Sequence, residues 1–422
     1  MKKNFLMLSA AFAFALCVGV TMTSCSETEG GDETPEENTD DSATYTVVDG
    51  ETLPAVVTGT VTIESGASVL LDGGLHVKDG GVLVIESGVT ITAQYDAINT
   101  DYIFVEQGGM IEADGGDADG VIVMTSNNET VGAWGGIHIC GYAPINSGSD
   151  SLSEIETLPY GGSDSNDNSG TLRYVRVEYT GFSYSEEQEC NGISFYGVGA
   201  GTTVEYVQAY HGSDDGFEFF GGTVNIKYCV VTSCSDDSFD WTDGWCGKAQ
   251  FIVAYQEASS EIGFECDCLL ECDNNGNDNV ATPASHPVIA NATLVGNGST
   301  SKNDGVMLKA GTEIELYNSL ITGKTNSLYI KTTNTDLQLS EGVSILSGNY
   351  FSTDMTNDSS AKLYTTSMLT ALNVIDYVSE LADNYVGTVA GAVDFGGDDF
   401  FAVVDYAGAV EAGNDWTAGW VK

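Results

Sequence analysis

The most constraining feature of this chain is a repeat with a period of 22 residues. The segment SDDGFEFFGG (residues 213–222) is followed 22 residues later by SDDSFDWTDG (residues 235–244). Near the start of the chain, VTIESGASVLL (residues 61–71) and LVIESGVTITA (residues 83–93) show the same offset. Because two unrelated segments share one period, the repeat indicates a structural unit that stacks on copies of itself.

Each repeat consists of short alternating apolar and polar stretches separated by Gly, Asn, Asp and Ser, which are typical of β-strands and turns. One coil of such strands cannot bury its inward side chains until another coil stacks on it. We therefore predict an all-β fold, a parallel β-helix over residues 45–335 with a small C-terminal cap over residues 336–422. Strand-crossover preferences favour a right-handed helix. An antiparallel sandwich is the alternative, but it would not require so regular a period.

The N-terminal residues predict export and anchoring. Lys2 and Lys3 precede an apolar stretch, so residues 1–24 are expected to be a signal peptide. The sequence MTSC before residue 26 resembles a bacterial lipobox, which implies lipidation of Cys25 and a lipid-anchored position in the outer membrane. Residues 25–44 are acidic and lack large apolar side chains, which predicts a disordered tether. The alternative is an ordinary secretory signal with a free thiol.

Charge limits the partners of the chain. It has 62 acidic residues and 13 basic residues, a net charge of −49. Such a surface repels nucleic acid and anionic membranes, so we expect no nucleic-acid partner and contact with a membrane only through the lipid anchor. The same charge attracts divalent cations.

Cysteine usage also bears on the compartment. Eight cysteines follow Cys25, and an even number in an exported chain favours disulfides. Zinc bound by Cys266, Cys268 and Cys272 is the alternative, although their spacing is not that of a standard structural zinc site.

Several phrases resemble a known family. They are GAWGGIHICGYAPIN, DNSGTLRYVRVEYTG, NGISFYGVGAGTTVEYVQAYHGSDDGFEFFGGTVNIKY and the final NDWTAGW. Together they are similar to exported right-handed parallel β-helix lipoproteins of Bacteroidetes, which have a pectin-lyase-like fold. The acidic tether is likewise similar to the surface-export signals of lipoproteins from that phylum, which implies exposure at the cell surface; a spacer facing the periplasm is the alternative. The resemblance implies a fold and a location and adds little on biochemical role.

The repeated acids predict a metal site. Strand alternation directs the large aromatic side chains of each repeat inward and places acids of successive coils about 4.8 Å apart. Calcium binds six to eight oxygens from carboxylates and carbonyls, so we expect Ca²⁺ there. A solvated acidic face is the alternative. The proposed ligands are Asp214, Asp215, Glu218, Asp236, Asp237 and Asp240, with Glu261 and Glu265 as possible additions.

Aromatic residues near the predicted loops suggest a glycan-binding surface, because aromatic rings stack on sugars. The candidates are Trp134, Tyr142, Tyr184, Trp241 and Trp245. Packing in the core is the alternative for each of them. We accordingly expect a surface-exposed binding or adhesion module with a glycan or a surface protein as its partner.

Two other functions stay open. The first is a polysaccharide-active enzyme, either a hydrolase or a lyase. The segment HGSDDG offers His211 with Asp214 and Asp215, as in the polygalacturonase group of pectin-lyase-like proteins, but that group's Arg-Ile-Lys substrate clamp is absent. The second is a structural surface protein that contacts other proteins.

Overall fold

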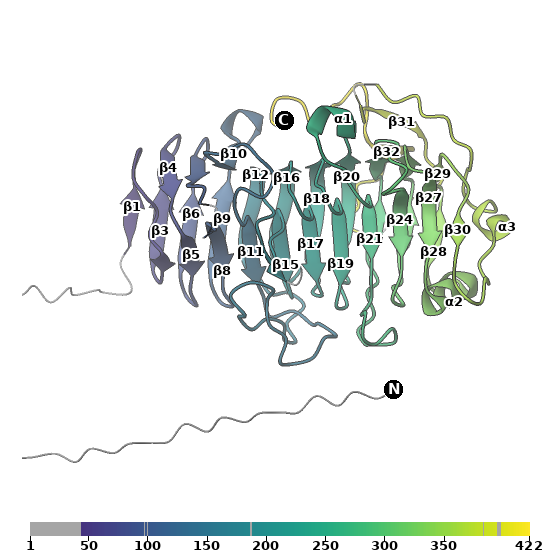
Figure 1. Cartoon of the computed structure of the whole chain (residues 1–422), viewed down its shortest axis with the longest axis horizontal. Coiled ribbons are helices and arrows are strands. Elements are labelled where there is room, and N and C mark those ends of the chain that lie inside the picture. The colour runs from purple at the N-terminus through teal and green to yellow at the C-terminus, as the bar shows by residue number, and fades with distance from the viewer. Residues whose placement is uncertain (1–43, 97, 99, 186–187, 383, 395–397) are drawn as a thin grey trace, which may run out of the picture. The chain divides into compact units, whose positions relative to one another are not determined.

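A computed structural model of the protein describes residues 44–422 except 97, 99, 186–187, 383 and 395–397. The described part is a right-handed parallel β-helix, which confirms the predicted fold class (Figure 1). Cys25 and most of the predicted tether lie outside the described residues. None of the helices in the described part is long and apolar enough to cross a membrane.

Two parallel sheets form the walls of the helix. Sheet B has 11 strands, in the order β2-β5-β8-β11-β15-β17-β19-β21-β24-β27-β30. Its strands are β2 (Val56–Val57), β5 (Gly74–Val77), β8 (Tyr102–Val105), β11 (Ile137–Cys140), β15 (Ile193–Tyr196), β17 (Phe217–Phe220), β19 (Phe239–Thr242), β21 (Leu270–Cys272), β24 (Asp304–Leu308), β27 (Asn326–Ile330) and β30 (Thr356–Asn357).

Sheet A has 17 strands and wraps the rest of each coil. Its strands are β1 (Tyr45–Val47), β3 (Thr60–Ile63), β4 (Ser68–Leu71), β6 (Val82–Ile85), β7 (Thr90–Ala93), β9 (Met110–Asp114), β10 (Ile122–Ser126), β12 (Gly170–Glu178), β16 (Thr203–Tyr210), β18 (Asn225–Thr232), β20 (Lys248–Tyr255), β22 (Val288–Ala290), β23 (Thr293–Val295), β25 (Glu315–Tyr317), β26 (Leu320–Thr322), β28 (Ile345–Ser347) and β29 (Tyr350–Phe351).

Short elements lie outside the two sheets. They are the hairpin of β13 (Ser183–Ser185) and β14 (Gln188–Glu189), the hairpin of β31 (Gly387–Ala390) and β32 (Tyr406–Val410), the 3₁₀ helix η1 (Ala118–Gly120), and the helices α1 (Ser259–Ile262), α2 (Thr333–Glu341) and α3 (Thr366–Leu369).

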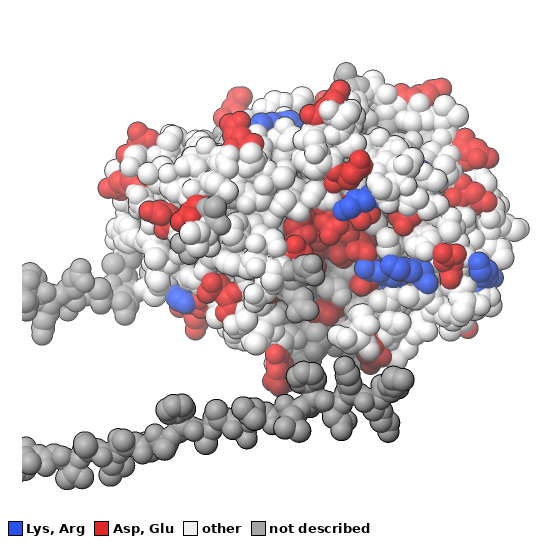
Figure 2. Space-filling view, in the orientation of Figure 1, with Lys and Arg blue, Asp and Glu red and all other residues white. Residues whose placement is uncertain are grey.

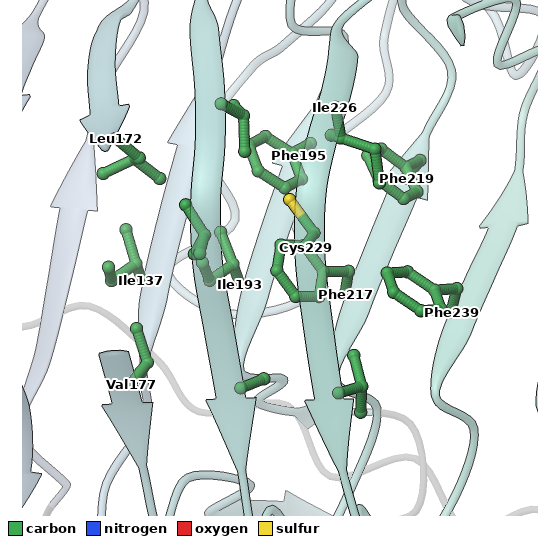
Figure 3. Packing of buried hydrophobic residues seen from close by; sticks show 14 of the residues in the cluster. Ile137, Leu172, Val177, Ile193, Phe195, Phe217, Phe219, Ile226, Cys229 and Phe239 are labelled. Carbon is green, nitrogen blue, oxygen red and sulfur yellow. The ribbon is translucent and has the colours of Figure 1, made fainter. Parts of the chain in front are cut away.

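The 22-residue period is one turn of the helix. Phe217 pairs with Phe239, and Glu218 pairs with Asp240, in the parallel register of β17 and β19. The two phenylalanines point inward, are at most 2% exposed, and stack with their ring centres 5.3 Å apart. Figure 3 shows these rings among the aliphatic side chains of the core. Burial of this aromatic column drives the coils together and leaves the acids outside.

Four strands of sheet A bend in the middle, and a residue with left-handed backbone conformation stands at each bend. Tyr174, Tyr206, Tyr228 and Phe251 have φ values of 51°, 55°, 57° and 56° in the middle of β12, β16, β18 and β20. Their rings stack along the outside of the helix at centre distances of 4.4, 4.5 and 5.0 Å. The tyrosines that recur in the repeat therefore form an external aromatic ladder, whose stacking offsets the cost of the unusual backbone.

The C-terminal region differs from the predicted cap. The coils continue past residue 335, since β28 pairs with β25 and β30 pairs with β27. After α2 the described residues form one further helix, the four-residue α3. The chain then returns along sheet A, where β32 contacts β20 and β23, and ends near the middle of the helix (Figure 1).

This returning segment, residues 406–422, covers the aromatic ladder; we call it the C-terminal strap. The Trp420 ring packs edge-on against Tyr174 and Tyr206, at centre distances of 5.8 and 6.2 Å. Lys422 donates to Glu178 at 2.9 Å and to the Tyr179 hydroxyl at 3.0 Å. The final NDWTAGW phrase therefore closes the side of the helix rather than its end.

The predicted disulfides are not present in the described part of the chain. Its eight cysteines are all free thiols, and all but Cys246 are buried. They pack as small apolar side chains, as Cys229 does in the core. No group of side chains in the described residues brings Cys266, Cys268 and Cys272 together as metal ligands, so the zinc alternative is not supported either.

We expect Trp420→Ala to lower the free energy of unfolding by about 3–5 kcal/mol, the usual cost of removing a buried tryptophan. Trp420 is 1% exposed, and its removal leaves a cavity over the ladder. Urea denaturation measures the change, with Leu372→Ala as the control because Leu372 is 59% exposed. Equal stability of Trp420→Ala and the wild type would contradict the role assigned to the strap.

Candidate functional site

Acidic side chains gather on the outer face of sheet B, over β17, β19 and β21 (Figure 2). We call this surface the acidic patch and define it as Asp214, Asp215, Glu218, Asp236, Asp237, Asp240, Asp267, Glu271 and Asp273. Two kinds of position supply it. Some acids stand in the turns that precede the strands, and others are the outward residues of the strands themselves.

The helix brings all six predicted ligand residues together. Carboxylate oxygens lie within 4.8 Å of one another in three overlapping groups. The groups are Asp214–Asp215–Asp236, Asp215–Glu218–Asp240 and Asp237–Asp240–Glu271. Because the groups share members, the acids form one continuous surface across three coils.

Sequence reasoning missed Glu271. It pairs with Asp240 in the register of β19 and β21, but it follows Asp240 by 31 residues because a loop is inserted before β21. The matching position of Glu271 in its strand could have identified it. The inserted loop concealed this match, because it lengthens the 22-residue spacing. Glu261 and Glu265, the suggested additions, belong to none of the groups found among the described residues. Glu261 lies in α1, and Glu265 is exposed.

Two of the acids also hold the coils together. Asp215 Oδ1 accepts the backbone N–H of Asp237 at 2.8 Å, and Asp237 Oδ1 accepts that of Cys268 at 2.6 Å. Asn191 begins the same ladder one coil earlier, since its Oδ1 accepts the N–H of Asp215 at 3.2 Å. Asp215 and Asp237 therefore each bond one coil to the next, and Asp237 shares a further hydrogen bond with Glu271.

Other oxygens of the patch lack any partner. Asp240 Oδ1 and Asp273 Oδ1 are buried and accept no hydrogen bond. Glu218 receives one bond, from Asn191 Nδ2 to Oε2 at 2.6 Å. A buried carboxylate oxygen without a donor is costly, so these atoms favour a bound proton or a cation.

Burial raises most carboxyl pKa values in the patch. It raises the pKa of Asp214 to about 8, with the charges of Glu189 and Asp236 adding to the effect. The pKa values of Asp215, Glu218, Asp237 and Asp240 lie well above the usual range for the same reasons, burial first and neighbouring acids second. At an effective dielectric constant of about 20, two like charges about 4.8 Å apart repel by about 3.5 kcal/mol. The acids therefore cannot all be ionised without a counter-charge.

Two lysines border the patch. Lys302 Nζ lies 3.5 Å from Asp236 Oδ1, and Lys309 Nζ lies 2.5 Å from Glu271 Oε1. Burial lowers the pKa of each lysine, but the neighbouring carboxylates outweigh it and raise the pKa overall. Burial likewise raises the pKa of Glu271, yet its bond with Asp237 and the charge of Lys309 bring the pKa below its usual value. Both lysines are thus fixed cations and not proton acceptors.

Three other strong bases are paired elsewhere, whereas Lys331 lies near enough for its charge to lower the pKa of Glu271 and Asp273. Arg173 and Arg176 stand on β12 in sheet A, where they pair with Asp114 and Glu178 at 2.8 and 2.5 Å. Lys324 is 3% exposed and donates to three backbone carbonyls at 2.8–3.0 Å. Burial lowers its pKa, but its three donor positions are occupied.

A family model described as a pectate-lyase like beta helix domain matches residues 55–421. The chain belongs to this family. No curated protein and no solved structure matches it. Membership of the pectate-lyase-like β-helix family fits a role connected with polysaccharides. The match also includes the C-terminal strap, so the strap belongs to the family's domain.

The aromatic prediction was wrong for the three tryptophans. Trp134, Trp241 and Trp245 are each 1% exposed, because they occupy inward positions of the coils. Trp245 stacks on Phe219 at a ring-centre distance of 4.1 Å, and no tryptophan of the three can reach a sugar. Packing in the core, the alternative stated above, applies to them.

Tyr142 and Tyr184 are 41% and 46% exposed and remain accessible. Tyr142 follows β11, Tyr184 stands in the hairpin strand β13, and the segment that carries Glu154 lies between them in the sequence. Burial raises the pKa of Glu154 to about 7, and the Tyr196 hydroxyl donates to it at 3.4 Å. These insertions form a wall beside the acidic patch.

The raised pKa values predict an unusual pH dependence without added metal. Above pH 6 the folded protein keeps a proton on Glu154 up to its pKa of about 7 and on Asp214 up to its pKa of about 8, whereas the unfolded chain has released both, since unfolded pKa values of carboxyls lie at about 4. The free energy of unfolding should fall as pH rises, by up to about 1.4 kcal/mol per pH unit for each proton kept. Urea denaturation in chelator measures it. Asp214→Asn should flatten the slope, and the exposed control Asp119→Asn should not; an unchanged slope in Asp214→Asn contradicts this assignment.

Proposed function

We propose that this β-helix binds a glycan on the outer face of sheet B and that Ca²⁺ held by the acidic patch supports the binding. The observation that carries the proposal is the buried, unpartnered Asp240 Oδ1 within the overlapping carboxylate groups. A cation placed there would give that oxygen a partner and would offset the repulsion among its neighbours.

Calcium suits the patch for reasons of charge and size. It is a hard cation that takes several carboxylate oxygens in a flexible arrangement. Asp215, Glu218 and Asp240 offer oxygens from two coils, and Asp237 with Glu271 extends the set to a third. Because the protons held at neutral pH would leave when the cation binds, affinity for Ca²⁺ should increase with pH.

The glycan part of the proposal has two supports. The family fits a polysaccharide-related role. In addition, Tyr142 and Tyr184 present accessible rings in the insertions between β11 and β15, and accessible rings can stack on sugar rings. A bound calcium ion has coordination positions left for sugar hydroxyls, which links the two parts.

Binding is favoured over conversion because most strong bases near the patch are paired with acids; the exception is Lys331, whose Nζ contacts Met307 Sδ at 3.9 Å. The bordering lysines are fixed cations, the arginines stand on sheet A, and His211 pairs with Glu257 at 2.6 Å rather than with Asp214 or Asp215. Hydrolysis is the second candidate, because a carboxyl with a raised pKa, as in Asp214 or Glu154, is what a general acid requires. A structural protein that contacts other surface proteins is the third.

We also propose that the protein is lipid-anchored in the outer membrane and exposed at the cell surface, on the basis of the signal-like residues 1–24 and Cys25. Metabolic labelling with palmitate should label the wild type and leave Cys25→Ala unlabelled. Equal labelling of the two, or labelling of neither, would argue against the anchor.

Calcium should stabilise the protein. At pH 8, a calcium concentration about 100-fold above the dissociation constant is expected to add about 2.7 kcal/mol of stability. Asp240→Asn should lose most of this gain, because it removes a charge shared by two carboxylate groups. Thermal unfolding with calcium or chelator measures the effect, with Asp119→Asn as the matched control. An unchanged melting temperature up to millimolar calcium would rule out the metal site.

Glycan binding and turnover can be separated in one assay. Immobilised polysaccharides should retain the wild type in calcium and release it in chelator, with no new reducing ends and no unsaturated products. New reducing ends would favour the hydrolase, and unsaturated products a lyase. Absence of both retention and turnover would leave the protein-contact function.

A further inference from the structure

A polar pocket of about 440 Å³ lies at the end of β19, between the insertions at residues 142–169 and 273–287. We propose that this pocket is a subsite for one uncharged sugar residue of the glycan bound by sheet B, an inference that rests on the proposed function. Its volume falls in the range of small-ligand sites, roughly 300–1,000 Å³. It is also much larger than a single ion requires.

A hydroxyl–carboxylate pair, the buried Tyr160 and the partly buried Asp243, lines the pocket. The Tyr160 hydroxyl donates to Asp243 Oδ2 at 3.0 Å, while Asn275 Nδ2 is 3.4 Å from Asp243 Oδ1. Among the described residues that line the pocket there is no lysine, arginine or histidine. Ser147 also bonds to Asp243, so three of the roughly four acceptor sites of a carboxylate are used and one is left for a sugar hydroxyl.

The walls of the pocket are held in place before any ligand arrives. Asn146 Nδ2 donates to Asn274 Oδ1 at 2.7 Å and to the carbonyl of Pro283 at 2.9 Å. Asn275 Nδ2 donates back to Asn146 Oδ1 at 3.0 Å. These bonds tie one insertion to the other, so a ligand would not have to order the loops when it binds.

The chemistry of the lining selects an uncharged, hydroxylated ring. The carboxylates of Asp243 and Asp278 would repel a uronate or another anion. The exposed side-chain amide of Asn277 supplies a donor as well as an acceptor, whereas a metal ion would use acceptors alone. The exposed side chain of Leu152 adds an apolar wall for the face of a sugar ring.

The test compares affinities for neutral polysaccharides, namely mannan, galactan and β-glucan, with the affinity for polygalacturonate, using the full chain in calcium. We expect a neutral polysaccharide to bind, and Tyr160→Phe and Asp243→Asn each to weaken that binding by about tenfold or more. Tyr317→Phe is the matched control, because the Tyr317 hydroxyl also donates to a carboxylate, Glu315 Oε2 at 2.6 Å, but stands on β25 of sheet A. It should bind like the wild type.

The outcomes separate this inference from the proposed function. Wild-type affinity in both pocket variants, or binding of polygalacturonate alone, overturns the subsite and leaves glycan binding by sheet B intact. Loss of the calcium-induced rise in melting temperature in Asp243→Asn would show that the pocket holds a cation and would also overturn it. If the wild type binds none of the polysaccharides, the glycan function fails and the subsite fails with it.

Discussion

The structure depends on parallel, in-register pairing of each coil with the next. Strands in a sheet lie about 4.8 Å apart, so residues one coil apart in the sequence become direct neighbours in space. Inward positions thereby form the column of Phe217 and Phe239, and outward positions place Glu218 over Asp240. Burial of the aromatic column stabilises the stack, and the same register forces the acids together. The in-register pairing of successive coils thus determines both the core and the candidate site.

The acidic patch shows how a solenoid concentrates charge. Each carboxylate alone would be an ordinary surface group, but the register repeats it and the neighbouring insertions exclude water from it. Asp215 and Asp237 use part of their capacity for backbone bonds between coils, while Asp240 and Asp273 keep buried oxygens without partners. The clustered carboxylates of the patch therefore need bound positive charge to limit their mutual repulsion. In the absence of a metal ion, bound protons supply it.

Sequence reasoning succeeded where the period was intact. The offset of 22 residues predicted the fold, the inward aromatics and the meeting of all six acids, because each follows from stacking alone. It failed where insertions or long-range packing decide the outcome. Glu271 was hidden by the loop before β21. The three tryptophans were misplaced because Trp241 is an inward residue of β19 and because the segments after β10 and β19 bury Trp134 and Trp245. The C-terminal strap was read as an end cap, since nothing local in NDWTAGW reveals that it packs on a tyrosine ladder formed by strands two hundred residues earlier.

The claim that stacked carboxylates retain protons until a cation replaces them can be measured directly by infrared spectroscopy. At neutral pH, the spectrum of metal-free protein should contain the carbonyl stretch of protonated carboxylic acids, and this band should disappear when Ca²⁺ is added, with matching release of protons into the buffer. A metal-free spectrum at neutral pH that contains only ionised carboxylates would contradict the account.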